Sequence, residues 1–237
     1  MKKAASFALG CKVNQYESEA IAELFAEKGY EIVGIDEEAD VYVINTCTVT
    51  NFGDKKSRQL IRKVKRQNEN AIVAVVGCYA QTAPKELMEI AGVNLVIGTK
   101  DRAQIVEMVE QYDRANGVEN HVSDIMKERV FEPLSIQKLA NRTRAYLKIQ
   151  DGCSQYCSYC IIPYARGPIR SREPQEVVAE VKRLAENGFK EVVLTGIHVA
   201  SYGKDRRDTS LPDILKQVHE VEGIERIRFS SIEPNVV

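Results

Sequence analysis

The chain has 237 residues, of which 44% are hydrophobic and 28% charged, and its 33 Lys and Arg nearly balance 34 Asp and Glu. This composition excludes a disordered chain, and the near-zero net charge indicates no particular partner. No apolar run approaches the ~18 residues that a membrane-spanning helix needs, so we expect no membrane partner. The length allows about one or two folded domains.

The N-terminus has two features of a lipoprotein export signal, because Lys2 and Lys3 precede a short apolar stretch that ends near Cys11. We reject this interpretation, since about seven apolar residues are the lower limit for such a signal and a polar helix is predicted directly after Cys11. We therefore expect a cytoplasmic protein. Cysteines stay reduced there, and grouped cysteines bind metals or carry out chemistry more often than they form disulfides.

Residues 1–112 alternate short apolar runs with amphipathic segments, the pattern of β-α units in a mainly parallel sheet. Helices are predicted after each run: the first begins with a capping box of Asn14 and Glu17, the second covers residues 57–67, Pro84 opens the third, and the fourth follows Thr99. We expect an open α/β domain. Its predicted strands are residues 4–9, 41–45, 72–76 and 93–97.

Residues 113–141 lose this periodicity and are predicted to form a linker. The alternation returns in residues 142–237, which we expect to form the first part of a β/α barrel. Because the predicted sheet has an unfinished edge, we expect the chain to be a fragment of a longer protein. The predicted strands are residues 145–149, 191–195 and 227–231, and the predicted helices are residues 174–187 and 212–220.

Cys153, Cys157 and Cys160, the second cysteine trio, have C-x3-C-x2-C spacing in the loop after the first predicted strand of this domain. Structural zinc takes four ligands, and the nearest candidate in the sequence is His198. An iron–sulfur cube normally takes four protein thiolates, so three leave one iron open to a small molecule. We favour the cube, with zinc or an inert thiol cluster as the alternatives.

Cys11, Cys47 and Cys78, the first cysteine trio, each lie at or just after the carboxyl end of a predicted strand. Because the carboxyl ends of parallel strands line one crevice, we expect the three thiols to converge on a second metal site. The alternative is that each is a small buried side chain, which is the usual environment of a free cysteine.

The second cysteine trio, with Tyr159 just before its last member, resembles the radical S-adenosylmethionine superfamily. The three-cysteine domain in front of it resembles, more narrowly, the radical methylthiotransferases, and the match covers nearly the whole chain. The shared motifs are Leu-Gly-Cys-Lys-Val-Asn-Gln-Tyr-Glu-Ser at residues 9–18, Asn-Thr-Cys-Thr at 45–48, Val-Gly-Cys-Tyr-Ala-Gln at 76–81, Ile-Pro-Tyr-Ala-Arg-Gly at 162–167, Arg-Ser-Arg at 170–172 and Ser-Ser-Ile-Glu-Pro at 230–234.

This resemblance implies a β/α barrel and two 4Fe-4S clusters. The cluster on the second cysteine trio would bind S-adenosyl-L-methionine and release a 5′-deoxyadenosyl radical, whereas the cluster on the first would deliver or relay sulfur. The cofactor would also contact Tyr159, Gly196 and His198. For His198, a satisfied core or surface histidine is the alternative.

Among these enzymes the chain most resembles the branch that adds a methylthio group to carbon 2 of N6-threonylcarbamoyladenosine beside the tRNA anticodon. The residues that carry this likeness are 10–14, the Pro-Tyr-Ala-Arg run and residues 194–203. The alternatives are an isopentenyladenosine substrate, an aspartate of a ribosomal protein, and a non-catalytic iron–sulfur or zinc scaffold that binds RNA. An electron donor such as flavodoxin or ferredoxin is implied as a partner, and DNA is not.

The second predicted helix of the first domain is strongly basic, and phosphate neutralisation by such a helix favours RNA binding. A solvated helix face is the alternative. The cations are Lys55, Lys56, Arg58, Arg62, Lys63, Lys65 and Arg66. Three arginines after the second cysteine trio, Arg166, Arg170 and Arg172, could bind carboxylate or phosphate groups or pair locally.

Overall fold

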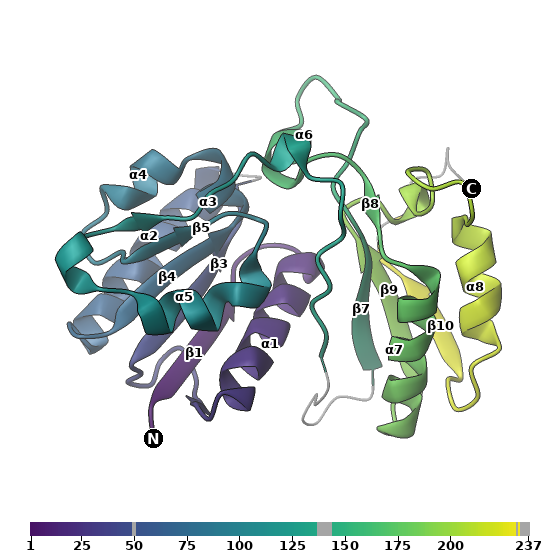
Figure 1. Cartoon of the computed structure of the whole chain (residues 1–237), viewed down its shortest axis with the longest axis horizontal. Helices are drawn as coiled ribbons and strands as arrows, with labels where there is room; N and C mark the ends of the chain where they lie inside the picture. The colour runs from purple at the N-terminus through teal and green to yellow at the C-terminus, as the bar shows by residue number, and fades with distance from the viewer. Residues whose placement is uncertain (49–50, 137–143, 231, 233–237) are drawn as a thin grey trace.

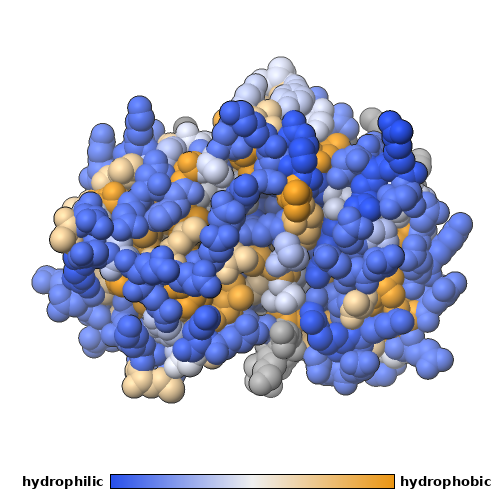
Figure 2. All heavy atoms as spheres, viewed as in Figure 1, coloured by the Kyte–Doolittle hydropathy of each residue, from blue (hydrophilic) through white to orange (hydrophobic). Residues whose placement is uncertain are grey.

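The computed structural model describes residues 1–48, 51–136, 144–230 and 232, and only the backbone of residues 51–54. Two α/β units lie side by side, each a sheet with helices packed on it (Figure 1). In the described part of the chain, no helix is both long and apolar enough to cross a membrane. The face seen in Figure 2 is mostly hydrophilic, with small hydrophobic patches between charged side chains.

The first sheet has the strand order β2-β1-β3-β4-β5-β6, and its neighbouring strands are all parallel. The strands are β1 (Lys3–Ala8), β2 (Glu31–Ile32), β3 (Val41–Thr46), β4 (Ile72–Gly77), β5 (Leu95–Ile97) and β6 (Glu119–Asn120). The helices are α1 (Lys12–Glu27), α2 (Asn51–Gln67), α3 (Cys78–Thr82), α4 (Pro84–Met88) and α5 (Ile105–Gln111), and short 3-10 turns occur at η1 (Arg102–Gln104), η2 (Arg114–Asn116) and η3 (Ile125–Lys127).

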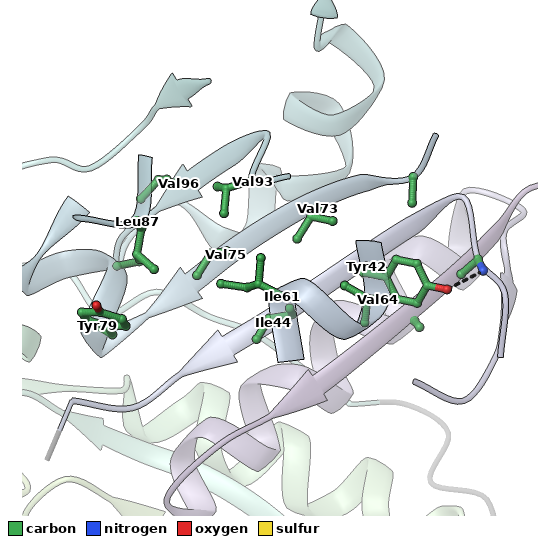
Figure 3. Close-up of a cluster of buried hydrophobic side chains, with 14 residues drawn as sticks. Tyr42, Ile44, Ile61, Val64, Val73, Val75, Tyr79, Leu87, Val93 and Val96 are labelled. Atoms are coloured by element: carbon green, nitrogen blue, oxygen red, sulfur yellow. Dashed lines mark hydrogen bonds between the residues drawn. The ribbon is translucent and has the colours of Figure 1, made fainter. Parts of the chain in front are cut away.

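Helices cover both faces of this sheet, which explains why its strands are almost continuously apolar. Helices α1 and α5 pack on one face, and α2 and α4 pack on the other. Figure 3 shows Ile61 and Val64 of α2 and Leu87 of α4 against the strands. The buried Tyr42 hydroxyl accepts a hydrogen bond from the Ala39 backbone nitrogen, at 2.9 Å, so its polar end is satisfied within this core.

The second sheet has the order β10-β9-β7-β8, in which β7, β9 and β10 are parallel and β8 is antiparallel to β7. It curls like half of a barrel, with α7 and α8 packed on it, so the α/β class and the incomplete barrel expected from the sequence are confirmed (Figure 1). The elements are β7 (Arg144–Asp151), α6 (Ile162–Arg166), β8 (Arg170–Ser171), α7 (Pro174–Glu186), β9 (Glu191–Gly196), η4 (Val199–Ser201), α8 (Leu211–His219) and β10 (Arg226–Phe229).

The start of α1 differs from the predicted capping box. The helix begins at Lys12 with Cys11 as its N-cap, so Asn14 and Glu17 lie inside it and are fully buried. The Asn14 amide donates to the backbone oxygens of Leu9, at 3.0 Å, and Thr46, at 2.9 Å. The capping-box prediction is wrong because the Asn14 amide bonds to backbone oxygens of other segments, and its Oδ1 contacts the Cys11 thiol instead of a backbone N–H of the first turn.

The predicted linker, residues 113–141, contributes β6 to the first sheet, where Glu119 and Asn120 pair with β5. Pairing of so short a strand leaves no hydrophobic pattern in the sequence. Residues 137–141 lie outside the described residues, as do most residues of the motif at 230–234 and the last residue of the strand predicted at 227–231. The division into residues 1–112, a linker and residues 142–237 stays a prediction.

Candidate metal centres at the domain interface

The strand register brings two members of the first cysteine trio to adjacent positions. Thr46 of β3 pairs with Gly77 of β4, and Cys47 and Cys78 are the residues that directly follow them. Neighbouring strands are about 4.8 Å apart, so the two cysteines leave the sheet side by side. On the other side of β3, β1 ends at Ala8 opposite Asn45, and Cys11 follows three residues later.

Gly10 allows the loop that carries Cys11 to pass directly against Cys47. Its φ is +109°, and a Cβ atom on Gly10 would lie 2.8 Å from the Cys47 sulfur. Strand β2 lies on one side of β1, whereas β3 and the later strands lie on the other side. The order in which strands are added to the sheet therefore reverses at β1. Such switch points leave a crevice beyond the strand ends, where ligands bind in open α/β sheets.

Two polar side chains connect Cys11 and Cys78. The buried Cys78 sulfur lies 3.1 Å from Nε of Arg166, which donates to it. The Cys11 thiol lies 3.4 Å from Oδ1 of Asn14, and the same oxygen accepts a hydrogen bond from Arg166 Nη2 at 2.7 Å. Burial raises the pKa of the Cys78 thiol to about 11, although Arg166 opposes the rise.

The donor set fits an iron–sulfur cube better than a single ion. Zinc needs its four ligands around one atom, whereas the thiolates of a cube bind different irons and can stand further apart. Three thiols that leave different strands therefore suit the cube.

The second cysteine trio lies on the loop between β7 and α6. The loop begins at Gly152, whose φ is +71° and where a Cβ atom would lie 1.9 Å from the Pro168 carbonyl oxygen. The buried Cys153 is held by a 3.0 Å hydrogen bond from its backbone nitrogen to the Gly167 oxygen. Cys157 is exposed and Cys160 half-buried, so the tip of the loop presents two thiols at the surface.

The two cysteine trios lie at one domain interface. Cys160 precedes Arg166 by six residues, so their Cα atoms are at most ~20 Å apart, and the Arg166 side chain reaches from there to Cys78, 3.1 Å from its Nε. In Figure 1, α6 lies above and to the right of α3, the helix that begins at Cys78, and the two helices are in contact.

The three residues predicted to contact S-adenosyl-L-methionine differ from one another in exposure and packing. Tyr159 is 90% exposed. A Cβ atom on Gly196 would lie 2.7 Å from Oε1 of Gln150, and the same oxygen accepts a 2.8 Å hydrogen bond from the backbone nitrogen of His198. The His198 ring lies 2.5 Å from the hydroxyl of Ser201. The contacts with Gln150 thus explain why a glycine stands at position 196 and how the His198 backbone is held. Binding of a cofactor by these two residues stays a prediction.

A buried carboxylate, Glu17, is the site residue that the sequence interpretation missed. Its oxygens lie 2.6 Å from Arg102, 2.5 Å from Arg166 and 2.8 Å from Lys148. Burial would raise the pKa of Glu17, but the three cations outweigh it and hold the pKa well below its usual range. The signal in the sequence was its position four residues before Ile21, on the apolar stripe of the helix.

Asp151 is the second carboxylate of this cluster and joins β7 to the same cations. It lies 2.7 Å from Lys148, 3.5 Å from Arg166 and 3.7 Å from Arg170. Burial opposes ionisation of Asp151, but these cations lower its pKa. Arg172 is the third arginine for which the sequence suggested an anion contact, and its Nη2 atom lies 3.1 Å from a Glu180 oxygen. Arg166, Arg170 and Arg172 therefore all contact carboxylates of the chain itself.

Several basic residues of α2 contact other parts of the chain. Arg58 pairs with Glu86 at 2.7 Å, Lys63 pairs with Asp36, and Lys65 donates to the Ala71 backbone oxygen at 2.9 Å. Lys55, Lys56, Arg62, Lys63 and Arg66 are exposed to solvent. Because α2 starts at the cysteine edge and rises 1.5 Å per residue, Arg66 lies roughly 22 Å from that start. RNA binding by this helix stays a prediction.

Gly10→Ala is expected to impair binding of the first cluster, because the added methyl group overlaps Cys47. Overpacking of this kind destabilises by ~1–3 kcal/mol, in addition to the ~1–2 kcal/mol of left-handed strain. The matched control is Gly29→Ala: Gly29 has a φ of +84°, and a Cβ atom there meets nothing within 4 Å. Thermal unfolding and iron content measure both effects. Equal iron loss in the two variants would show that the contact with Cys47 is irrelevant.

Both parts of the chain match known families. Residues 3–98 match the family described as "Uncharacterized protein family UPF0004", and residues 147–236 match the "Radical SAM superfamily". The radical S-adenosylmethionine methyltransferase TsrM from Kitasatospora setae has a similar fold, with a TM-score of 0.58 at 16% identity over 92% of this chain and 51% of that one. The two family matches thus indicate a radical SAM protein with a second, separate domain in front of its barrel.

Curated relatives narrow this class. The threonylcarbamoyladenosine tRNA methylthiotransferase MtaB of Bacillus subtilis is 52% identical over 100% of this chain and 53% of its own length, and the MtaB of Aquifex aeolicus is 42% identical over 97% and 56%. A tRNA-2-methylthio-N(6)-dimethylallyladenosine synthase of Dictyoglomus thermophilum is 34% identical over 96% and 52%. The chain belongs to the radical SAM methylthiotransferase family, and it spans about half the length of the curated relatives it matches.

Proposed function

We propose that the protein of which this chain is part adds a methylthio group to carbon 2 of N6-threonylcarbamoyladenosine in tRNA. The observation that carries this proposal is the contact of Arg166, six residues after the second cysteine trio, with Cys78 of the first trio. Radical chemistry and sulfur transfer need two metal centres close together, and this interface provides thiols for both. The names of the MtaB relatives support the choice of nucleoside.

The cysteines of the chain would bind two 4Fe-4S clusters. The first cysteine trio would hold one cluster in the crevice beyond β1, β3 and β4, and the second trio would hold the other on its surface loop. When bound, the clusters and S-adenosyl-L-methionine supply the radical and the sulfur for a C–H bond that no side chain can attack. The exposed Tyr159 is available to pack against the cofactor, with Gly196 and His198 at the neighbouring strand end.

The protein would act on tRNA in the cytoplasm, where thiols stay reduced, and would draw electrons from a small donor such as flavodoxin or ferredoxin. The open cations of α2 would meet the phosphate backbone. An isopentenyladenosine substrate is the second candidate, supported by the name of the Dictyoglomus relative, which is less similar to this chain than the MtaB relatives are.

Mass spectrometry of tRNA nucleosides tests the proposal. Cells that lack the gene encoding this chain should lose the methylthio derivative of N6-threonylcarbamoyladenosine and keep its unmodified form. A plasmid copy should restore the derivative. Loss of the isopentenyladenosine derivative would assign the other substrate, and an unchanged nucleoside profile would favour a protein substrate or the RNA-binding scaffold.

A further inference from the structure

Arg166 belongs to the barrel unit, yet its guanidinium group ends among the residues of the first cysteine trio. It is fully buried, and each of its nitrogens has a partner in the first domain. Nε donates to Cys78, Nη1 lies 2.5 Å from a Glu17 oxygen, and Nη2 donates to Asn14 at 2.7 Å. Asn14 in turn accepts from the Cys11 thiol, so Arg166 touches one predicted cluster ligand and the neighbour of another.

We propose that Arg166 is a positioning residue for the first cluster, through which docking of the barrel fixes the Cys78 sulfur and tunes the reduction potential of the cluster. The inference rests on the proposed function, since it takes the first cysteine trio as cluster ligands. It goes beyond that function by making one domain supply the electrostatic surroundings of a cluster held by the other.

The shape of the guanidinium group is what suits Arg166 to this position. Its planar fork carries donors in fixed directions, whereas a lysine ammonium is a compact point charge. Nε faces the sulfur while both Nη atoms face Glu17, which Arg102 and Lys148 hold from other directions. The guanidinium is therefore immobilised before a cluster binds, and such outer partners tune the metal through the ligands they orient.

The charge balance of the interface also supports an effect of Arg166 on the reduction potential of the first cluster. Four buried cations, Arg102, Lys148, Arg166 and Arg170, face three carboxylates, Glu17, Glu132 and Asp151. The cluster thus has one more positive than negative charge, and Arg166, one of its cations, contacts Cys78. Reduction adds an electron to a cluster, and both a fixed cation and a hydrogen bond to a ligand sulfur favour the more negative, reduced form. Loss of Arg166 should therefore make the first cluster harder to reduce.

The experiment isolates the first cluster by replacing the second cysteine trio with alanine in the full chain. The one-electron potential of the remaining cluster is measured by titration with dithionite, followed by electron paramagnetic resonance. Arg166→Gln should shift the reduction equilibrium by about tenfold toward the oxidised form, which is ~59 mV for a one-electron couple. Arg166→Lys, which keeps a cation but not the Nε–H donor, should shift it less and change the spectral line shape.

The matched control is Arg172→Gln, which removes another buried arginine of the barrel unit that pairs with Glu180. It should destabilise the chain without moving the potential. If Arg166→Gln and Arg166→Lys both leave potential and line shape unchanged, Arg166 only fastens the domains together and the inference is overturned. If the parent with arginine binds no iron at all, the assignment of the first site, and with it the proposed function, fails instead.

Discussion

Glu17→Ala is expected to lower the free energy of unfolding by about 3–5 kcal/mol, because removing one partner of a buried ion-pair cluster leaves uncompensated charge. Arg102, Lys148 and Arg166 all lie within 2.8 Å of the Glu17 carboxylate, and all are buried. Urea unfolding followed by circular dichroism measures the change. Glu27→Ala, at an exposed position of the same helix, is the control and should change stability by no more than about 0.5 kcal/mol.

The pH dependence of the free energy of unfolding is a second test of the buried charge on Glu17. Glu17 has a folded-state pKa below its ordinary value of 4.5, so its contribution is complete above that pH and is lost as the pH falls toward the folded pKa. The wild-type chain should therefore lose stability steadily below about pH 4.5, and Glu17→Gln should show a shallower decline. Identical slopes would mean that Glu17 does not carry a buried charge.

Cys157→Ala and Cys47→Ala are expected to separate radical formation from sulfur insertion in the full-length enzyme. Cys157→Ala removes a predicted ligand of the second site, so reductive release of 5′-deoxyadenosine should fall to background. Cys47→Ala leaves that site intact and should retain the release while abolishing the methylthiolated product. Liquid chromatography with mass spectrometry detects both compounds in one reaction.

Ser158→Ala is the matched control for Cys157→Ala, because Ser158 is an exposed residue of the same loop. It should leave the release of 5′-deoxyadenosine unchanged. If Cys47→Ala also stopped this release, the two cysteine trios would form a single functional unit, and the assignment of separate roles would be wrong.

The sequence predicted the elements that carry long apolar patterns. Strands β3 and β4, buried on both faces, stand out as Val- and Ile-rich runs, and α7 begins at Pro174 and ends before Gly188 as its signals indicate. The five-residue helices α3 and α6 were not predicted, because a single turn or so has no periodicity. Both helices begin or end at residues of the interface.

The interface could not be predicted because its contacts join residues that are far apart in the sequence. Lys148 and Glu17 are 131 residues apart, and Arg166 and Glu17 are 149 apart. Each residue alone is compatible with a surface position or a helix cap, as the wrong capping box shows. The cysteine positions were more informative, since their common place at strand ends follows from the sheet topology alone.

Iron and acid-labile sulfide counts after anaerobic reconstitution test the central claim that both cysteine trios hold cubes. The wild-type chain should bind about eight irons and eight sulfides, and replacement of Cys11, Cys47 and Cys78 by alanine should lower both counts to about four, since each cube contains four irons. Wild-type counts near four that the triple replacement leaves unchanged, or zinc in place of iron at the first trio, would contradict the account.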